Sequence, residues 1–296
     1  MTAGTPELGV FVTPEAATYP DVVRQVQAAE RGGLELVGIQ DHPYQRRFLD
    51  TFTLIADLLA RTERVRVFPD VANLPLRPPP VLAKTAASLD VMSGGRFELG
   101  LGAGGFWDAI AAMGGPRRTP GESVEALEEA IAILRASWSG ERSVRFAGRH
   151  YAVDGWHPGP PPAHPIGIWI GAYGPRMLRL TGRLGDGWLP SLPYAPPERI
   201  PEMQRRIDDA AASAGRDPGA IRRILNVGGE ITGGPATELL QGPPDHWIEA
   251  LTGFVLELGF DGLAFWPTGG GDDLGQIERF AAEVAPGVRE AVARGG

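Results

Sequence analysis

The chain has 296 residues, of which 43% are hydrophobic and 22% charged, a balance typical of folded globular proteins. Its net charge of −8 disfavours a nucleic-acid partner, because phosphate backbones select basic surfaces. It contains no cysteine, which excludes disulfides and thiolate chemistry, and its five histidines lack the spacing of a zinc site. We therefore expect a cytoplasmic protein that acts on a small molecule, with no metal, no membrane span and no secretion signal.

The first half of the chain alternates apolar runs with stripes of helical spacing. Strands are predicted at residues 8–12, 36–40, 65–71 and 97–101. Helices are predicted between them, at residues 21–31, 52–59 and 81–92. A Gly-Gly pair follows the first and the third of these helices, as glycine commonly does where a helix ends.

The second half repeats the alternation. Thr119-Pro120-Gly121-Glu122 matches a capping box with proline at the first helical position, so a helix is predicted to begin there. Residues 144–153 predict a small hairpin. Further strands are predicted at residues 168–170, 187–189, 222–231 and 262–265, and further helices at 175–184, 203–214, 248–258 and 275–294.

Eight strand–helix alternations in a chain of this length favour parallel strands joined by crossover helices. We predict a single α/β domain over residues 1–296, a (β/α)8 TIM barrel with extra loop and hairpin insertions. A doubly wound open sheet is the competing architecture. In such a barrel the chemistry lies on the loops that follow the strands.

A loop almost without side chains follows the fourth predicted strand. Residues 100–105 (GLGAGG) fit the dinucleotide pattern G-x-G-x-x-G, but that pattern requires a helix to begin at once, and Gly114-Gly115-Pro116 interrupts the segment that follows. A glycine-softened strand end is a second interpretation. We favour a third, in which Ala103, Gly104 and Gly105 form a platform that a planar cofactor ring approaches closely.

Asp41-His42 follows the second predicted strand and so falls at the mouth of a barrel. A histidine there can hydrogen-bond or exchange protons near neutral pH. A lone histidine is more often structural or exposed, but its position at the mouth favours a functional role.

The segment between the fifth predicted strand and its helix combines free backbone N–H groups, a helix N-terminus and an arginine, which together favour phosphate. A tight turn with a surface arginine is the alternative. The candidate binding residues are Gly171, Ala172, Tyr173, Gly174, Pro175 and Arg176.

Large aromatic residues near the predicted strand ends are candidates for the wall of an apolar substrate pocket, although each alone also fits a core position. They are Phe106, Trp107, Trp188 and Trp266. Glu98 comes early in its strand, so we expect it to point away from the catalytic end.

Several of these segments belong to one recognisable series of motifs. The series comprises Val71 to Arg77, Leu82 to Asp90, Ser93-Gly94-Gly95-Arg96, Leu99 to Gly104, Ile170 to Arg176 and Asp186-Gly187-Trp188. Together they resemble the bacterial luciferase-like superfamily, from about residue 8 to residue 292. Its members are (β/α)8 barrels that use flavin mononucleotide (FMN) or the deazaflavin coenzyme F420, and dimers are common among them.

The resemblance also implies roles for individual residues. The Asp41-His42 pair is similar to the F420-dependent branch, which implies that His42 serves as the catalytic residue near the reactive ring carbon, with Asp41 beside it. A non-prolyl cis peptide is implied at Asp70-Val71, as a bulge behind the ring. The phosphate side is implied at Gly171 to Arg176.

One departure from the superfamily pattern concerns the substrate. Some members that oxidise sugar phosphates carry a glutamate, acting as proton donor, where this chain has Gly105. That role is unfilled unless Asp108 takes it. Lys84 is the only lysine, so lysines that hold phosphate in some relatives are also missing. Both departures weaken the case for sugar-phosphate oxidation.

Three functions stay open at this point. The first is an F420-dependent oxidoreductase that transfers a hydride between the deazaflavin and a small organic substrate. The second is an FMN-dependent monooxygenase that uses reduced flavin and dioxygen. The third is a non-catalytic F420-binding protein for storage or delivery.

Overall fold

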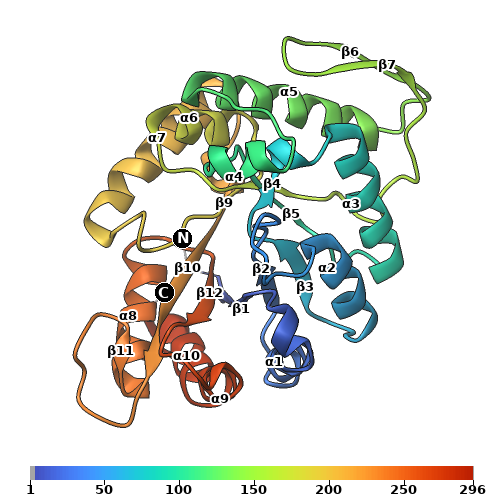
Figure 1. The fold of residues 1–296 in the computed structure, drawn as a ribbon. Coiled ribbons are helices and arrows are strands. Elements are labelled where there is room, and N and C mark those ends of the chain that lie inside the picture. The colour runs from blue at the N-terminus through green and yellow to red at the C-terminus, as the bar shows by residue number, and fades with distance from the viewer. Residues whose placement is uncertain (1–3, 296) are drawn as a thin grey trace.

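All eight predicted strands form, and they run parallel around one ring (Figure 1). The computed structural model describes residues 4–295. Apolar runs become strands here because helices cover the outside of the ring and side chains fill its inside. The strand segments are β1 (Glu7–Val12), β2 (Leu36–Ile39), β3 (Arg66–Pro69), β4 (Ala72–Asn73), β5 (Leu99–Gly102), β8 (Ile168–Ile170), β9 (Gly187–Trp188), β10 (Arg222–Ile231) and β12 (Gly262–Pro267).

The ring closes into a barrel, which excludes the open sheet. Hydrogen-bonded neighbours follow the order β3-β2-β1-β12-β10-β9-β8-β5-β4. The predicted third strand is interrupted into β3 and β4 at a cis peptide between Asp70 and Val71. β4 pairs with β5, and β3 meets the segment entering β5, where the N–H of Val67 donates to the carbonyl of Arg96 (2.9 Å). The (β/α)8 prediction is confirmed.

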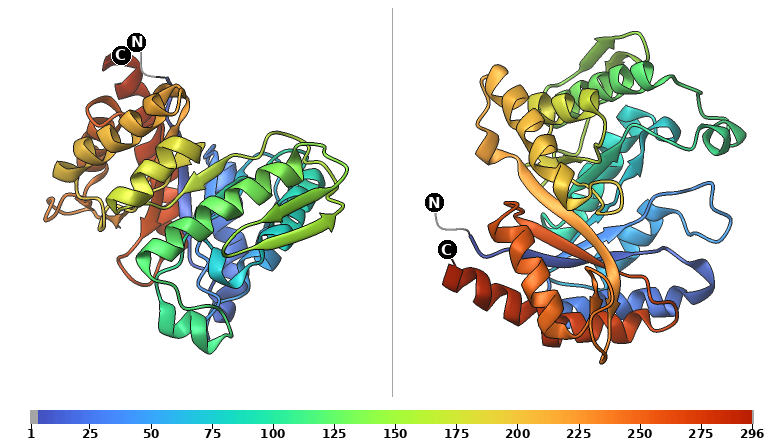
Figure 2. Two further views of the ribbon diagram at one scale, coloured as in Figure 1. Left: turned by 90° about the horizontal axis from the view of Figure 1, so that it is seen from above. Right: turned by 90° about the vertical axis from the view of Figure 1, so that its left-hand side faces the viewer.

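The predicted helices surround the ring, as both views in Figure 2 show. Thr119 and Glu122 form the predicted capping box, each side chain bonding the other's backbone N–H. The last predicted helix is continuous but passes through a π-helical turn at Phe280–Val284. The helices are α1 (Tyr19–Arg31), α2 (Thr51–Ala60), α3 (Pro79–Ser93), α4 (Trp107–Ala112), α5 (Pro120–Trp138), α6 (Pro175–Leu184), α7 (Ile200–Ser213), α8 (Pro244–Leu256), α9 (Asp273–Arg279) and α10 (Ala285–Gly295).

Two smaller elements lie outside this alternation. The predicted hairpin is present as the antiparallel pair β6 (Val144–Ala147) and β7 (Ala152–Trp156), which packs on α5 through a small apolar cluster that includes Ile133 (Figure 1). The short β11 (Gln241–Gly242) pairs with the end of β10. Of the helices that the structure describes, none has both the length and the apolar character needed to cross a bilayer.

The inside of the barrel is layered. Alternate residues of a strand point inward, so the strand positions 7, 66, 98 and 222 bring charged side chains together near the strand starts. A second layer is apolar and forms its own cluster of Leu36, Phe68, Trp169, Leu189 and Ile224. Beyond it, toward the C-terminal ends of the strands, the interior becomes polar again, and the candidate site begins there.

Candidate active site

His42 lies in the loop after β2 and packs between two aromatic rings from neighbouring loops. Its imidazole is stacked on Tyr44, with ring centroids 5.4 Å apart, and meets the edge of Phe106 at 5.3 Å. Phe106, in the loop after β5, is 58% exposed. The structure thus brings two predicted site residues together. It adds Tyr44, which sequence reasoning missed although it lies two residues after His42.

Burial favours the neutral form of the His42 imidazole. It is half-buried, and burial lowers its pKa, against a smaller opposite effect of the Asp41 carboxylate. The side-chain amide of Gln40 lies 3.4 Å from Nδ1. If the Gln40 N–H donates to Nδ1, the neutral tautomer carries its proton on Nε2. His42 can then offer that proton to a reacting oxygen and take one back.

Asp41 has a different role from the cofactor contact predicted for it. Its side chain is fully buried, and both carboxylate oxygens are engaged. One accepts hydrogen bonds from the N–H of Asn73 (2.8 Å) and Nε of Arg77 (3.0 Å), and the other accepts from Nη2 of Arg77 (2.7 Å). Asp41 therefore joins the loop that carries His42 to the loop after β4. It positions its neighbour and does not line the mouth.

Asp70 and Asn226 form a buried polar pair inside the barrel. Asp70, after the last residue of β3, is 8% exposed, and Asn226, in β10, is 1% exposed. Nδ2 of Asn226 donates to Oδ1 of Asp70 (3.1 Å) and to Oγ of Ser191 (3.2 Å). Burial raises the pKa of Asp70 to about 7. Asn226 lies far from Asp70 in the sequence and was not predicted.

Three side-chain oxygens in this region have no hydrogen-bond partner among the described residues. They are Oδ2 of Asp70, Oδ1 of Asn226 and Oδ1 of Asn73. Buried polar atoms normally find a partner, so a group of orphaned acceptors indicates a place where a ligand or its bound water supplies the donor.

The cis peptide that the resemblance implied is present between Asp70 and Val71. The side chain of Val71 packs on the apolar layer and against two glycines: a Cβ on Gly102 would lie 2.6 Å from Val71, and one on Gly171 would lie 3.1 Å from it. These glycines are therefore needed to admit Val71.

The predicted platform after β5 is open only at its far end. Gly104 has a positive φ of 95° and packs on Pro75 and Trp107, whereas a Cβ on Gly105 would meet nothing within 4 Å. Ala103 is half-buried. The backbone N–H groups of Gly104 and Gly105 have no acceptor in the described part of the chain, so they are free to bind a ligand. Trp107 forms the wall behind them.

The loop between β8 and α6 is open in the same way. Gly174 is exposed, a Cβ there would meet nothing within 4 Å, and no side chain caps the first turn of α6, which begins at Pro175. The neighbouring Tyr173 is half-buried, and its hydroxyl accepts the N–H of Ser191 (3.0 Å). Ala172 is buried, so only its backbone is available. Free N–H groups at this helix start suit a phosphate.

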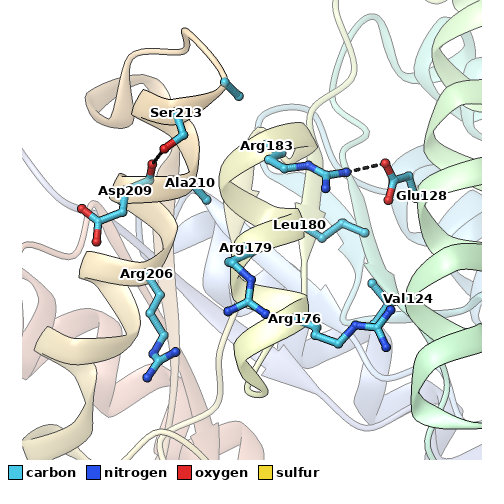
Figure 3. Close-up of a pocket in the computed structure, with 11 residues that line it drawn as sticks. Val124, Glu128, Arg176, Arg179, Leu180, Arg183, Arg206, Asp209, Ala210 and Ser213 are labelled. Atoms are coloured by element: carbon cyan, nitrogen blue, oxygen red, sulfur yellow. Dashed lines mark hydrogen bonds and ion pairs between the residues drawn. The ribbon is translucent and has the colours of Figure 1, made fainter.

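Arg176 does not face the mouth, contrary to its prediction as a cofactor ligand. Its guanidinium points toward Val124 on α5, across a groove of about 650 Å³ on the outside of the barrel (Figure 3). The groove runs between α5, α6 and α7 and is also lined by Arg179, Arg183, Leu180 and Arg206. Arg183 is paired with Glu128, Arg206 with Glu202 (2.6 Å) and Arg176 with Glu125 (4.0 Å). The phosphate side of the mouth thus depends on backbone and not on this arginine.

Two of the predicted pocket residues, Trp188 and Trp266, lie in different parts of the structure. Trp188 is completely buried in the core outside the barrel wall, where Nε1 donates to the carbonyl of Ala172 (2.9 Å), so its assignment to the substrate pocket is wrong. Trp266 is half-buried at the end of β12 and lies 4.9 Å from the ring of Phe11. Asp108, the residue that could have replaced the missing glutamate, has a side chain 91% exposed and is paired with Arg117.

Taken together, these features fit a planar redox ring with a phosphate. Open backbone N–H groups lie in two loops, an imidazole and aromatic rings stand beside one of them, and unpartnered oxygens lie inside the mouth. Within residues 4–295, no group of three or more histidine or acidic side chains is arranged to hold a metal ion.

Comparison with known proteins gives the same picture. The family model described as luciferase-like monooxygenase matches residues 5–228, well over half of the chain. Among curated proteins, the chain is similar to an F420-dependent glucose-6-phosphate dehydrogenase from Gordonia bronchialis, with 29% identity over 75% of the chain and 67% of the relative. It is also similar to an F420-dependent hydroxymycolic acid dehydrogenase from Mycobacterium tuberculosis, with 32% identity over 71% and 59%. The aligned part thus spans about two thirds of these relatives or less.

A solved structure shares the complete fold. The F420-dependent secondary alcohol dehydrogenase in complex with an F420–acetone adduct superposes with a TM-score of 0.85, covering 96% of this chain and 99% of that one. Sequence identity is 18%, so this likeness establishes the fold alone.

Proposed function

The chain belongs to the luciferase-like monooxygenase family, and on that premise we propose that it is an F420-dependent oxidoreductase acting on a small organic substrate. The observation that carries the proposal is the place of His42. A half-buried imidazole whose pKa is lowered by burial lies at the barrel mouth, against the loop whose free backbone N–H groups would meet a ring. The curated relatives named above are both F420-dependent dehydrogenases.

When bound, F420 supplies the hydride chemistry through its deazaflavin ring. The chain supplies position and protons. Backbone N–H groups of Gly104 and Gly105 and the loop of Gly171 to Gly174 would hold the cofactor. Asp70 and Val71 would lie behind its ring. Nε2 of His42 would donate a proton to a carbonyl oxygen of the substrate, or accept the proton of an alcohol in the opposite direction.

Two of the mouth loops support an uncharged substrate over a sugar phosphate. Residues 189–196, after β9, contain no charged side chain, and residues 232–243, after β10, contain only Glu238. The position of the acidic proton donor in sugar-phosphate oxidisers is occupied by Gly105, which is exposed and open. Phe106, Trp107 and Trp266 offer apolar surface instead. We therefore propose a neutral alcohol or carbonyl compound as substrate.

Titration of the purified protein with F420, followed by the cofactor's own fluorescence, tests the assignment. We expect saturable binding, and turnover with at least one member of a panel of neutral alcohols and carbonyl compounds. A protein that instead binds reduced FMN, ignores F420 and consumes oxygen is a monooxygenase. F420 binding without turnover, with His42→Ala indistinguishable from the wild type, indicates a storage protein.

We also propose that the enzyme acts in the cytoplasm and that two copies associate. The absence of cysteine from the sequence supports the cytoplasm. The dimer is supported by the dimers that are common in the superfamily. Light scattering at micromolar concentration tests the dimer, and a mass equal to one chain contradicts it.

A further inference from the structure

The side chains of Asp70 and Asn226 share one hydrogen bond, and each keeps one oxygen without a partner among the described residues. Nδ2 of Asn226 already donates to one carboxyl oxygen of Asp70. The second oxygen of each group, Oδ2 of Asp70 and Oδ1 of Asn226, is buried and unpartnered within the described chain. Both are acceptors, so they cannot bond to each other while Asp70 is ionised. One proton on Oδ2 converts it from an acceptor to a donor.

The surroundings of Asp70 favour the protonated form. Asn226 approaches from β10 and Gly38 from β2, and neither is charged. Ser191, from the segment after β9, bonds to Asn226 and is uncharged as well. Tyr173, from the loop after β8, is the titratable neighbour; burial, and to a smaller extent Asp70, raise its pKa. No ion pair of the described residues includes Asp70. Asp41 shows the contrast, since its equally buried carboxylate is matched by Arg77.

Asp70 lies next to the proposed cofactor loops. Val71, its neighbour across the cis peptide, packs against Gly102 and Gly171, which begin those two loops. A charge on Asp70 would therefore act at short range, and in a water-poor interior, on whatever occupies the mouth. Transfer of a hydride to a ring adds two electrons and one proton, so the ring gains one negative charge. A neutral Asp70 tolerates that charge, whereas an ionised Asp70 repels it.

We propose that Asp70 is an uncharged carboxylic acid paired with Asn226 below neutral pH, and that the loss of its proton as the pH rises weakens binding of the reduced, more negatively charged form of the cofactor. This inference rests on the proposed function. Asp70 is a positioning residue here, because it acts through its charge and not by exchanging a proton with the substrate.

The test measures the Kd of reduced and of oxidised F420 as a function of pH. Between about pH 6 and pH 8.5, the Kd of the reduced form should rise at least about tenfold for the wild type, as Asp70 loses its proton. The Kd of the oxidised form should change much less. Asp70→Asn keeps the shape and is neutral at every pH, so its Kd for the reduced form should stay level. Ionisation of the cofactor itself appears equally in both proteins.

A second measurement needs no cofactor. Infrared spectra of the ligand-free wild type should show the carbonyl stretch of a protonated carboxylic acid near pH 6, which weakens toward pH 8.5 and is absent from Asp70→Asn. If this band is absent from the wild type, or if the wild-type Kd does not depend on pH more than that of Asp70→Asn, the inference is wrong. If neither form of F420 binds at any pH, the proposed function fails, and the selectivity inference fails with it.

Discussion

Polar side chains are paired at one end of the barrel interior, whereas some of their oxygens are without a partner at the other end. Near the strand starts, Glu7 pairs with Arg66 and Arg222, and Arg66 also reaches Glu98. Glu98 accepts the N–H of Gly167 as well (2.7 Å). At the mouth, oxygens of Asp70, Asn73 and Asn226 have no partner among the residues that the structure describes.

This difference separates stability from function within the same strands. The charges near the strand starts are compensated, apart from Nε of Arg222, so that end can be accounted for by folding alone. The mouth keeps unpaired acceptors that cost stability unless a ligand or a proton satisfies them. Functional sites are where such costs are retained. Four experiments sharpen or break this division.

The largest loss of turnover should follow from substituting a histidine at the mouth, and not from substituting one at the base. His42→Ala should lower turnover by about 10²- to 10⁴-fold, because the proton exchange at Nε2 is lost. Its matched control is His164→Ala. His164 lies between Asp90 (2.7 Å) and Glu98 (3.4 Å) and should affect stability by about 1–3 kcal/mol, with turnover unchanged. Steady-state kinetics measures turnover, and urea unfolding measures stability. Equal losses of turnover in both variants would contradict the division between a functional mouth and a structural base.

Neutralising a buried acid should change the stability by different amounts at the two ends. Since the native pKa of Asp70 is raised to about 7, the folded protein holds this proton more tightly than the unfolded chain. Asp70 therefore contributes about 4 kcal/mol to the free energy of unfolding at pH values below its pKa in the unfolded chain. This contribution is lost as the pH rises toward 7. Asp70→Asn removes that loss and should be more stable than the wild type near pH 8.

The control for this prediction is Glu98→Gln at the base. It loses the ion pairs with Arg66 and His164, but burial raises the pKa of Glu98 as well, so this variant should gain less stability than Asp70→Asn at the same pH. Urea unfolding of both variants at several pH values measures the effect. A destabilised Asp70→Asn at pH 8 would show that the mouth acid is held as an ion.

Asp41→Asn tests a buried carboxylate beside His42 that is compensated like those at the base. Removing one charge of its buried pair with Arg77 should cost about 3 kcal/mol, since the arginine then keeps only the pairing with Asp50. Turnover should also fall, because the loop of His42 loses its anchor. Thermal unfolding and kinetics at saturating substrate measure the two effects, and a stable variant with full activity would remove the positioning role.

The smallest effect is expected for Arg176→Ala. The side chain lies in the outer groove, so F420 affinity should change by less than about twofold, as for surface substitutions in general. Fluorescence titration measures it. A tenfold loss of affinity would show that the cofactor extends into the groove.

The sequence predicted the barrel well because parallel strands buried on both faces read as apolar runs, and each helix has its own stripe. It predicted less of the site. The order of residues along a two-residue strand such as β9 does not show which face Trp188 occupies. Nor could periodicity join Asp70 to Asn226, which are 156 positions apart. Tyr44 could have been predicted, since aromatic residues near a candidate histidine are visible in the sequence itself.

Gly38 carries a consequence for how this protein could change over time. A Cβ there would lie 2.8 Å from Oδ2 of Asp70, so a side chain at residue 38 would displace that carboxyl oxygen. A mutation on β2 could therefore reorient the acid at the mouth without changing any mouth residue.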